Sequence, residues 1–159
     1  MATINTGKIY VLKNSFTAAA KILALSGNAN NNHLSMVNAN NVTANALWFL
    51  TPTHTAHYYR LHTITNGVQQ SLDVVNDNGV NSIKLHLANT GEYSGQYWRF
   101  DEWGTNPAYP YRLSNTFTGP NAHLDVYSDT FEAHLAGGDY SGQHWTLVPA
   151  DTVVVTTSV

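Results

Sequence analysis

The chain repeats one ordered set of landmarks three times. Each segment starts from a Tyr, passes a Leu-x-hydrophobe triplet and a His-Leu-small triplet, and closes on a Trp. The step from the Tyr to the middle of the first triplet is 14 residues each time, and the Trp residues are 50 and 47 residues apart. Matched order at matched spacing indicates three similar structural units. The landmarks are Tyr10, Ala24, His33 and Trp48; Tyr59, Asp73, His86 and Trp98; and Tyr111, Asp125, His134 and Trp145.

The residues inside each unit favour strands and turns over helices. Asn, Thr, Gly and β-branched residues are abundant, and these are weak helix formers. Short runs such as 58–62 and 82–87 alternate as strands do, and Asn- or Gly-rich clusters such as 76–79 separate them. Residues 17–23 could pass for a helix locally, but the repeat alignment places a turn and a strand there. We therefore expect an all-β chain.

Three units of this size need one another to bury a common core. A pseudo-threefold barrel capped by hairpins provides that core and leaves few open strand edges, and the three Trp residues would fill it. We expect one domain over residues 1–150, with repeats at approximately 7–52, 53–103 and 104–149. The β-prone tail, 151–159, is predicted to pack across the domain or across a homodimer interface.

Composition limits the partners. Seven Lys and Arg in a chain of net charge −3 cannot form the basic stripe that binds phosphates, so nucleic acid is not an expected partner. The chain has no Cys, no apolar run long enough for a membrane span, and no secretory signal at its start, which predicts a cytoplasmic location or release by an unconventional route. His54 and His57 have no nearby acid and no helical spacing, so we expect neither a metal nor another cofactor.

Two Gln-x-Trp motifs in register carry a family resemblance, one at Gln96–Trp98 and the other at Gln143–Trp145. The first repeat has Ala46 in place of the Gln. With the triplets upstream, residues 7–149 resemble the ricin-B-type (R-type) β-trefoil lectins. The chain lacks Cys and in this respect is similar to the fungal members of that family. The resemblance implies a β-trefoil fold and non-catalytic binding of glycans of the galactose or N-acetylgalactosamine type. It also implies a role in defence.

The resemblance further implies particular contacts. In the family an Asp accepts hydrogen bonds from two sugar hydroxyls, and an aromatic ring stacks on the sugar. Asp73 and Asp125 match the Asp, and His86 and His134 align near the ring.

An Asn beside the Gln adds a polar contact in the family. Gly95 and Gly142 stand in its place in the second and third repeats. In the first repeat Ala24 replaces the Asp, while Asn45 keeps the Asn. We therefore expect two sites, in the second and third repeats.

The same residues support sugar binding on physical grounds. One carboxylate can accept two hydroxyl bonds, whereas glycoside hydrolysis uses a pair of carboxyl groups. Tyr93 and Tyr140 each precede Ser-Gly-Gln and are candidate stacking walls, and Tyr127 adds a ring in the third repeat, which we expect to be the stronger site. The predicted carbohydrate-binding residues are Asp73, His86, Tyr93 and Gln96, together with Asp125, Tyr127, His134, Tyr140 and Gln143.

Each assignment has a structural alternative. The aspartates could cap their own turns, the histidines could be partly buried spacers, and the glutamines could tie the Trp strand to a neighbouring turn. Trp103 lies outside the repeat frame, either as a surface contact or as a plug of the barrel. The alternative function is a β-trefoil protease inhibitor that acts through exposed loops such as 28–32 and 104–110.

Overall fold

Six strands form a closed barrel. The computed structural model describes residues 1–26, 33–75, 83–104 and 106–152. The barrel order is β1-β12-β9-β8-β5-β4, and every neighbouring pair is antiparallel. The barrel strands are β1 (Ile9–Asn14), β4 (Trp48–Pro52), β5 (Tyr59–Thr63), β8 (Trp98–Glu102), β9 (Tyr111–Asn115) and β12 (Trp145–Pro149).

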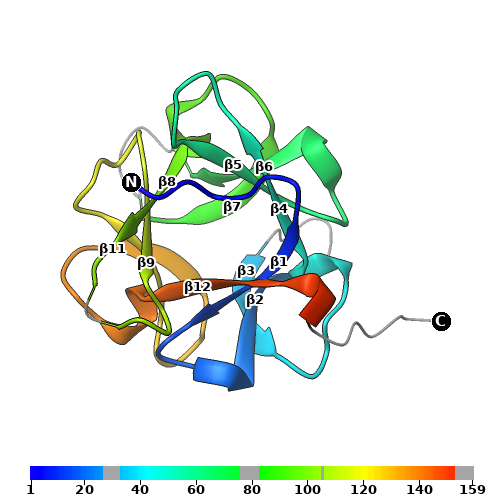
Figure 1. Cartoon of the computed structure of the whole chain (residues 1–159), viewed down its shortest axis with the longest axis vertical. Helices are drawn as coiled ribbons and strands as arrows, with labels where there is room; N and C mark the ends of the chain where they lie inside the picture. The colour runs from blue at the N-terminus through cyan, green and yellow to red at the C-terminus, as the bar shows by residue number, and fades with distance from the viewer. Residues whose placement is uncertain (27–32, 76–82, 105, 153–159) are drawn as a thin grey trace.

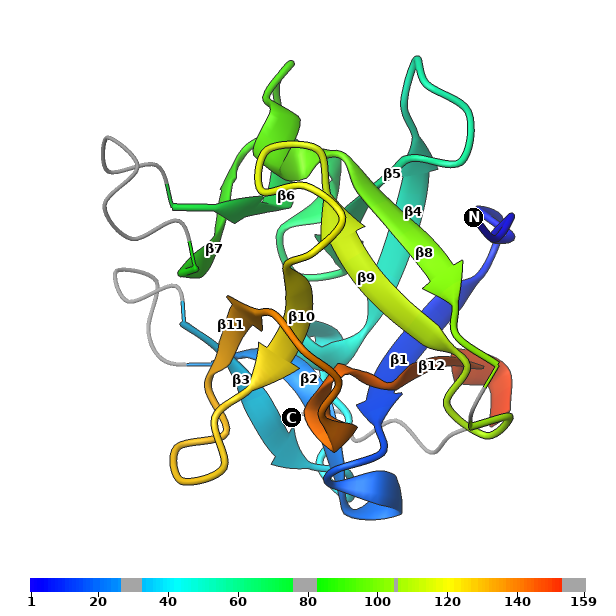
Figure 2. The same cartoon turned by 90° about the vertical axis from the view of Figure 1, so that its left-hand side faces the viewer.

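Three two-stranded hairpins complete the repeats and gather at one end of the barrel (Figure 2). Viewed down the short axis, the chain forms three lobes around a centre (Figure 1). A six-stranded barrel with three hairpins is the β-trefoil architecture, so the predicted all-β, pseudo-threefold fold is confirmed. The hairpins are β2 (Lys21–Ser26) with β3 (His33–Asn38), β6 (Gln70–Val74) with β7 (Leu85–Asn89), and β10 (His123–Val126) with β11 (Ala133–Ala136).

Short 3-10 turns link the strands. Residues 17–23, whose composition is helix-like, form one such turn followed by the start of β2, as the repeat alignment predicts. The strand places the apolar side chains of Ile22 and Leu23 in the core. Of these turns, η2, η4 and η5 immediately precede the last strand of their repeats. Within the described residues these turns are η1 (Ala18–Ala20), η2 (Ala44–Ala46), η3 (Gly67–Gln69), η4 (Ser94–Gln96), η5 (Ser141–Gln143) and η6 (Ala150–Thr152).

The three repeat-closing Trp residues lie in the core with almost no exposed surface. Each indole N–H donates to the backbone carbonyl of the Leu in its own repeat's first triplet, so a large apolar ring and a buried polar atom are both satisfied. The three Nε1···O distances are 2.9 Å from Trp48 to Leu23, 3.0 Å from Trp98 to Leu72 and 2.9 Å from Trp145 to Leu124.

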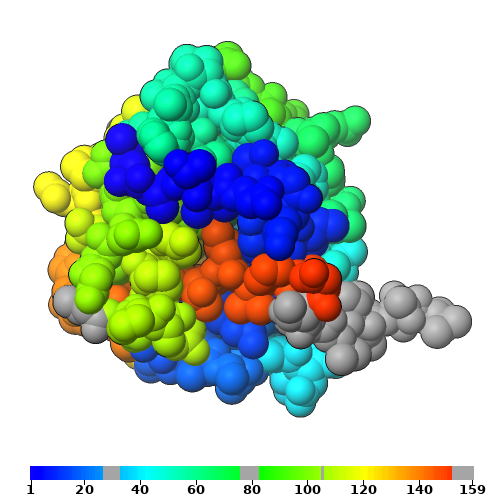
Figure 3. Space-filling model, viewed as in Figure 1, coloured from blue at the N-terminus to red at the C-terminus, as the bar shows by residue number. Residues whose placement is uncertain are grey.

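The N-terminal segment lies across the barrel end opposite the hairpins (Figures 2 and 3). The amide of Ala2 donates to the carbonyl of Phe100 at 2.7 Å, and that of Ile4 donates to the hydroxyl of Tyr59 at 3.0 Å. Ile4 is buried and belongs to the main core cluster. The first residues of the chain therefore cover this end of the barrel.

Several predicted segments lie outside the described residues: the Asn-rich loop 28–32, the turn cluster 76–79 and residues 153–159 of the tail. Packing of the tail and formation of a homodimer stay predictions. Among the residues that the structure describes, no helix is long and apolar enough to cross a membrane.

Candidate functional site

Asp73 is held in place by two hydrogen-bond donors. It lies on β6, where its Oδ1 accepts from the backbone N–H of Val74 at 2.8 Å and its Oδ2 accepts from Nε2 of Gln96 at 3.0 Å. Gln96 is itself fixed, because Nε2 also donates to the carbonyl of Asn89 and Oε1 accepts from the amide of Gly91. An ionised carboxylate has about four acceptor positions. Two acceptor positions of Asp73 therefore remain for a ligand.

In both repeats the Asp carboxylate lies so close to the backbone of the residue before the Gln that this residue must be Gly. A Cβ at Gly95 would lie 2.4 Å from Oδ1 of Asp73, and one at Gly142 would lie 2.2 Å from Oδ1 of Asp125. This explains why Gly stands where the resemblance expects Asn. The first repeat has Ala24 and no carboxylate, so Asn45 fits there; its Oδ1 accepts a hydrogen bond from Thr65.

Asp73 opens into a hollow of about 290 Å³, near the small end of the range for ligand pockets. Tyr93 and Phe117 form aromatic walls and are 59% and 41% exposed. The hollow thus combines a fixed acceptor with apolar ring surfaces. Its lining residues are Asp73, Val74, Glu92, Tyr93, Ser94, Gly95 and Phe117.

The Phe117 wall comes from the following repeat, and sequence reasoning missed it. Its backbone N–H donates to the carbonyl of Ser94 at 3.2 Å, and Phe16 makes the same 3.2 Å bond to Ser141 of the third repeat. Both phenylalanines lie two residues after the end of a barrel strand. The equivalent position beside the first repeat, two residues after β5, is Thr65. Aligning these positions across the repeats marks the two rings as equivalent but does not show which repeat each ring contacts.

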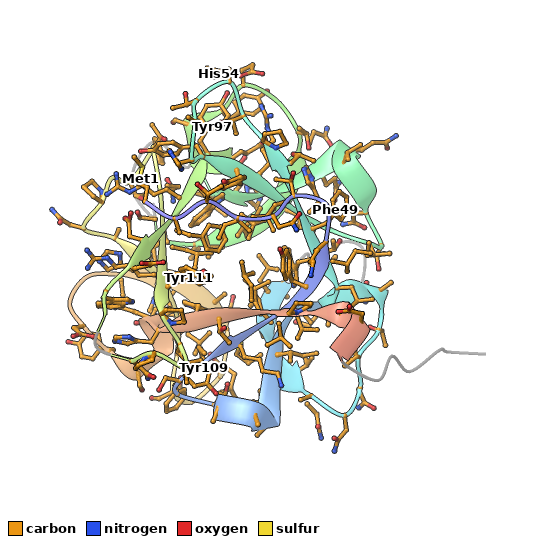
Figure 4. The ribbon with its side chains drawn as sticks, in the orientation of Figure 1. Met1, Phe49, His54, Tyr97, Tyr109 and Tyr111 are labelled. Carbon is orange, nitrogen blue, oxygen red and sulfur yellow. The ribbon has the colours of Figure 1, made fainter. Side chains whose placement is uncertain are left out.

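An acidic residue precedes the Tyr in both candidate sites. The Glu92 carboxylate accepts hydrogen bonds from the hydroxyl of Tyr97 and from Nη2 of Arg60, the latter at 3.2 Å. His54 lies on the same lobe as Tyr97 (Figure 4), and its Nδ1 is 3.5 Å from Oε2 of Glu92. The Tyr97 hydroxyl bond, followed by the charge of Arg60, lowers the pKa of Glu92 despite an opposing effect of desolvation, so Glu92 carries a negative charge at neutral pH.

The third repeat reproduces the anchor but covers its carboxylate more fully. Asp125 accepts from the N–H of Val126 at 2.7 Å and from Nε2 of Gln143 at 3.1 Å. Asp125 is only 6% exposed. The rings of Tyr127 and His134 stack in parallel, 3.7 Å apart between centroids. We expected the third repeat to be the stronger site; the structure instead makes the second-repeat carboxylate the more accessible one.

The remaining predicted residues fall into two groups. His86 pairs with Asp73, and His134 with Asp125, across their hairpins, so each ring is on the same sheet face as its Asp. His86 does not line the hollow.

The second group consists of the two glutamines and Tyr140. Gln96 and Gln143 have no exposed surface, so they can act on a ligand only through the aspartates that they hold. This corrects the expectation of direct sugar contact and matches the alternative in which they tie the Trp strand to a turn. Tyr140 is 63% exposed in the same motif position as Tyr93.

In the first repeat, apolar packing replaces the site. Val42 and Leu47 occupy the positions of Glu92 and Tyr97 and are buried together in a second small core cluster. Ala24, at the position of the Asp, belongs to the same cluster. The first repeat therefore offers no carboxylate acceptor.

Trp103 packs against the side of the third repeat. Its ring lies parallel to that of His144 at a centroid distance of 3.8 Å, and the guanidinium of Arg112 lies 4.9 Å from its centroid. Nε2 of His144 lies 2.6 Å from Oδ1 of Asp139, which reproduces the acid-to-strand contact that Glu92 makes with Tyr97. No group of three metal-ligating side chains is found within the described ranges.

The barrel and hairpins make this chain a β-trefoil protein. No protein-family model and no curated protein matches its sequence, whereas solved structures match its fold. A GlcNAcα1-4Gal-releasing endo-β-galactosidase from Clostridium perfringens superposes with a TM-score of 0.67 at 18% identity, covering 89% of this chain and 32% of the enzyme chain.

Two other matched structures contain saccharides. The Polyporus squamosus lectin, bound to the human-type influenza-binding epitope Neu5Acα2-6Galβ1-4GlcNAc, superposes with a TM-score of 0.70 at 16% identity, over 91% of this chain and 50% of that one. SeviL, bound to the asialo-GM1 saccharide, superposes with a TM-score of 0.67 at 16% identity, over 90% and 98%. This chain thus spans about a third of the galactosidase and half of the Polyporus lectin, and the likeness concerns the fold.

Proposed function

We propose that this protein is a lectin that binds glycans of the galactose or N-acetylgalactosamine type, with its principal site in the hollow of the second repeat. The observation that carries this proposal is the Asp73 carboxylate, fixed by two donors at an open hollow with aromatic walls. The saccharide complexes of two proteins with the same fold support it.

Binding needs only the groups already in place. Two neighbouring sugar hydroxyls donate to the free acceptor positions of Asp73, in charge-assisted hydrogen bonds. An apolar face of the sugar packs on Tyr93 or Phe117, where ring and C–H surfaces leave water together. Gln96 fixes the carboxylate before the ligand arrives, which reduces the ordering cost of binding.

The hollow is unsuited to glycoside hydrolysis, although it contains two carboxylates. A glycosidase needs one carboxylic acid with a raised pKa to protonate the leaving group. Glu92 has a lowered pKa, and both oxygens of Asp73 already accept protein hydrogen bonds. We therefore propose binding without catalysis.

The third repeat supplies a second site of the same kind. Asp125 is anchored as Asp73 is, Tyr140 corresponds to Tyr93, and Phe16 corresponds to Phe117. Two sites on one rigid domain would strengthen attachment to surfaces that display many copies of a glycan.

A glycan array with three variants tests the proposal. Asp73→Ala should remove most binding of free galactosides, and the double variant Asp73→Ala/Asp125→Ala should remove all of it. Asp129→Ala is the matched control, because Asp129 also accepts from the next backbone N–H but lies on an exposed turn. An unchanged array signal from the folded double variant would contradict a lectin function based on these aspartates.

A further inference from the structure

The hollow of the second repeat carries negative charge without a cation at its surface. Asp73 and Glu92 both line it, and none of the described residues that line it is Lys, Arg or His. The nearby Arg60 does not line the hollow and is already paired: its Nη2 donates to the carbonyl of Gly91 at 3.0 Å and to Glu92 at 3.2 Å, and its side chain is only 13% exposed. A ligand in the hollow therefore meets two carboxylates and no free guanidinium.

A second acidic residue, Glu92 in the second repeat and Asp139 in the third, accompanies the anchoring Asp; we call these two residues the acidic rim. The side chain of Glu92 is 74% exposed and that of Asp139 is 64% exposed, so both face solvent beside the candidate sites. In the first repeat, where Ala24 replaces the Asp, the corresponding residue is the buried Val42. The rim charge thus belongs to the site, since the fold itself tolerates an apolar residue at this position.

We propose that these sites select uncharged glycans and reject saccharides that carry a carboxylate or sulfate next to the bound sugar, with Glu92 as the specificity-determining residue. This inference rests on the proposed lectin function. The fold alone does not impose the choice, because the Polyporus squamosus lectin has the same architecture and is bound to a sialylated epitope.

The size of the effect follows from simple electrostatics. Two like charges about 4 Å apart in water repel by an amount equivalent to about a fivefold change in affinity, and lower effective dielectric near the protein increases it. Because the carboxylates of Glu92 and Asp139 are exposed to solvent, salt should screen their repulsion of a charged saccharide. The Debye length falls from about 30 Å at 0.01 M salt to about 3 Å at 1 M.

Fetuin and enzymatically desialylated fetuin are suitable probes, compared in binding assays at low and high salt. The assays are run at pH 8, above the ordinary histidine pKa of about 6.5. We expect the desialylated form to bind at least about fivefold more tightly at low salt and the ratio to shrink at high salt. N-Acetyllactosamine capped with either sialic acid or neutral fucose separates charge from bulk.

Variants then assign the selectivity to the rim. Glu92→Gln combined with Asp139→Asn should bring the affinity ratio of the two fetuin forms toward one, whereas Glu102→Gln, an exposed carboxylate outside the hollow, should leave the ratio unchanged. Equal wild-type affinity for both forms at low salt, or a ratio unaffected by the double variant, would overturn this inference alone. Absence of binding to either form would overturn the lectin function and this inference with it.

Discussion

The side chain of Gln96 donates a hydrogen bond to the carboxylate of Asp73 at 3.0 Å, and two residues further on, the indole of Trp98 donates to the carbonyl of Leu72 at 3.0 Å. The segment Gln96–Trp98 therefore binds two consecutive residues of the hairpin, Leu72 through its backbone carbonyl and Asp73 through its side-chain carboxylate. The motif joins the core to the candidate site. A variant must therefore change either the core contact of the Trp or the contact of the Gln with the Asp if stability and binding are to be measured separately.

Gly95→Ala should abolish binding in the second-repeat hollow while the fold survives. The added methyl would lie 2.4 Å from Oδ1 of Asp73, so the carboxylate must move, at a cost of about 1–3 kcal/mol in unfolding free energy. Isothermal titration with a galactoside and chemical denaturation measure the two effects. In Gly7→Ala the methyl faces only the end of the Asn5 side chain, at 3.2 Å, and both quantities should stay close to wild type.

Phe117→Ala should weaken binding in the second repeat, and Phe16→Ala should weaken it in the third. Removing an exposed aromatic wall takes away a stacking surface worth about 1 kcal/mol, or roughly a fivefold loss of affinity. Thr65→Ala changes the corresponding residue beside the first repeat and should have no effect on glycan affinity. Equal affinity in all three variants would show that the rings do not contact the sugar.

Trp98→Phe should destabilise the domain by about 2–4 kcal/mol, since it opens a cavity and leaves the carbonyl of Leu72 without its donor. Urea denaturation at constant protein concentration measures the loss. Val68→Ala, at a 57% exposed side chain, is the control and should change stability by less than about 0.5 kcal/mol. A loss for Trp98→Phe as small as that of the control would contradict the indole's place in the core.

Stability should fall as the pH drops below about 6.5. Burial, reinforced by nearby arginines, lowers the pKa of His62 and of His123 below the ordinary value of 6.5. The unfolded chain therefore binds protons that the folded chain refuses, so stability is complete above pH 6.5 and declines toward the lowered folded-state pKa values. Denaturation series from pH 8 to pH 5 test this.

His62→Gln should reduce the pH slope, because burial of the ring lowers the pKa of His62 and outweighs the opposing hydrogen bond to the Gln70 carbonyl at 2.8 Å. A slope that is identical in the wild type and in His62→Gln would rule out His62 as its source.

The repeat pattern was sufficient to predict the fold and the core. Trp spacing and matched triplets predict three units, and the burial of Trp48, Trp98 and Trp145 depends on the same interactions within each repeat. The structural alternative for the glutamines was also predictable, because Gln-x-Trp recurs with an Asp upstream in two repeats.

What the sequence could not provide was the pairing between repeats and the degree of burial. Phe117 is close to Ser94 only because the turn after β9 folds back onto η4, and no local pattern encodes that approach. The deeper burial of Asp125 relative to Asp73 likewise depends on tertiary packing. Both gaps concern distance in space between residues that are far apart in the chain.

The Phe walls mean that each candidate pocket belongs to two consecutive units, and that Phe16 closes the circle between the last unit and the first. A peptide with one unit alone would carry half of one binding surface and half of another. Three copies assembled head to tail around an axis would regain whole pockets. In the single chain, the covalent link between units keeps both walls of a candidate pocket together without an association step.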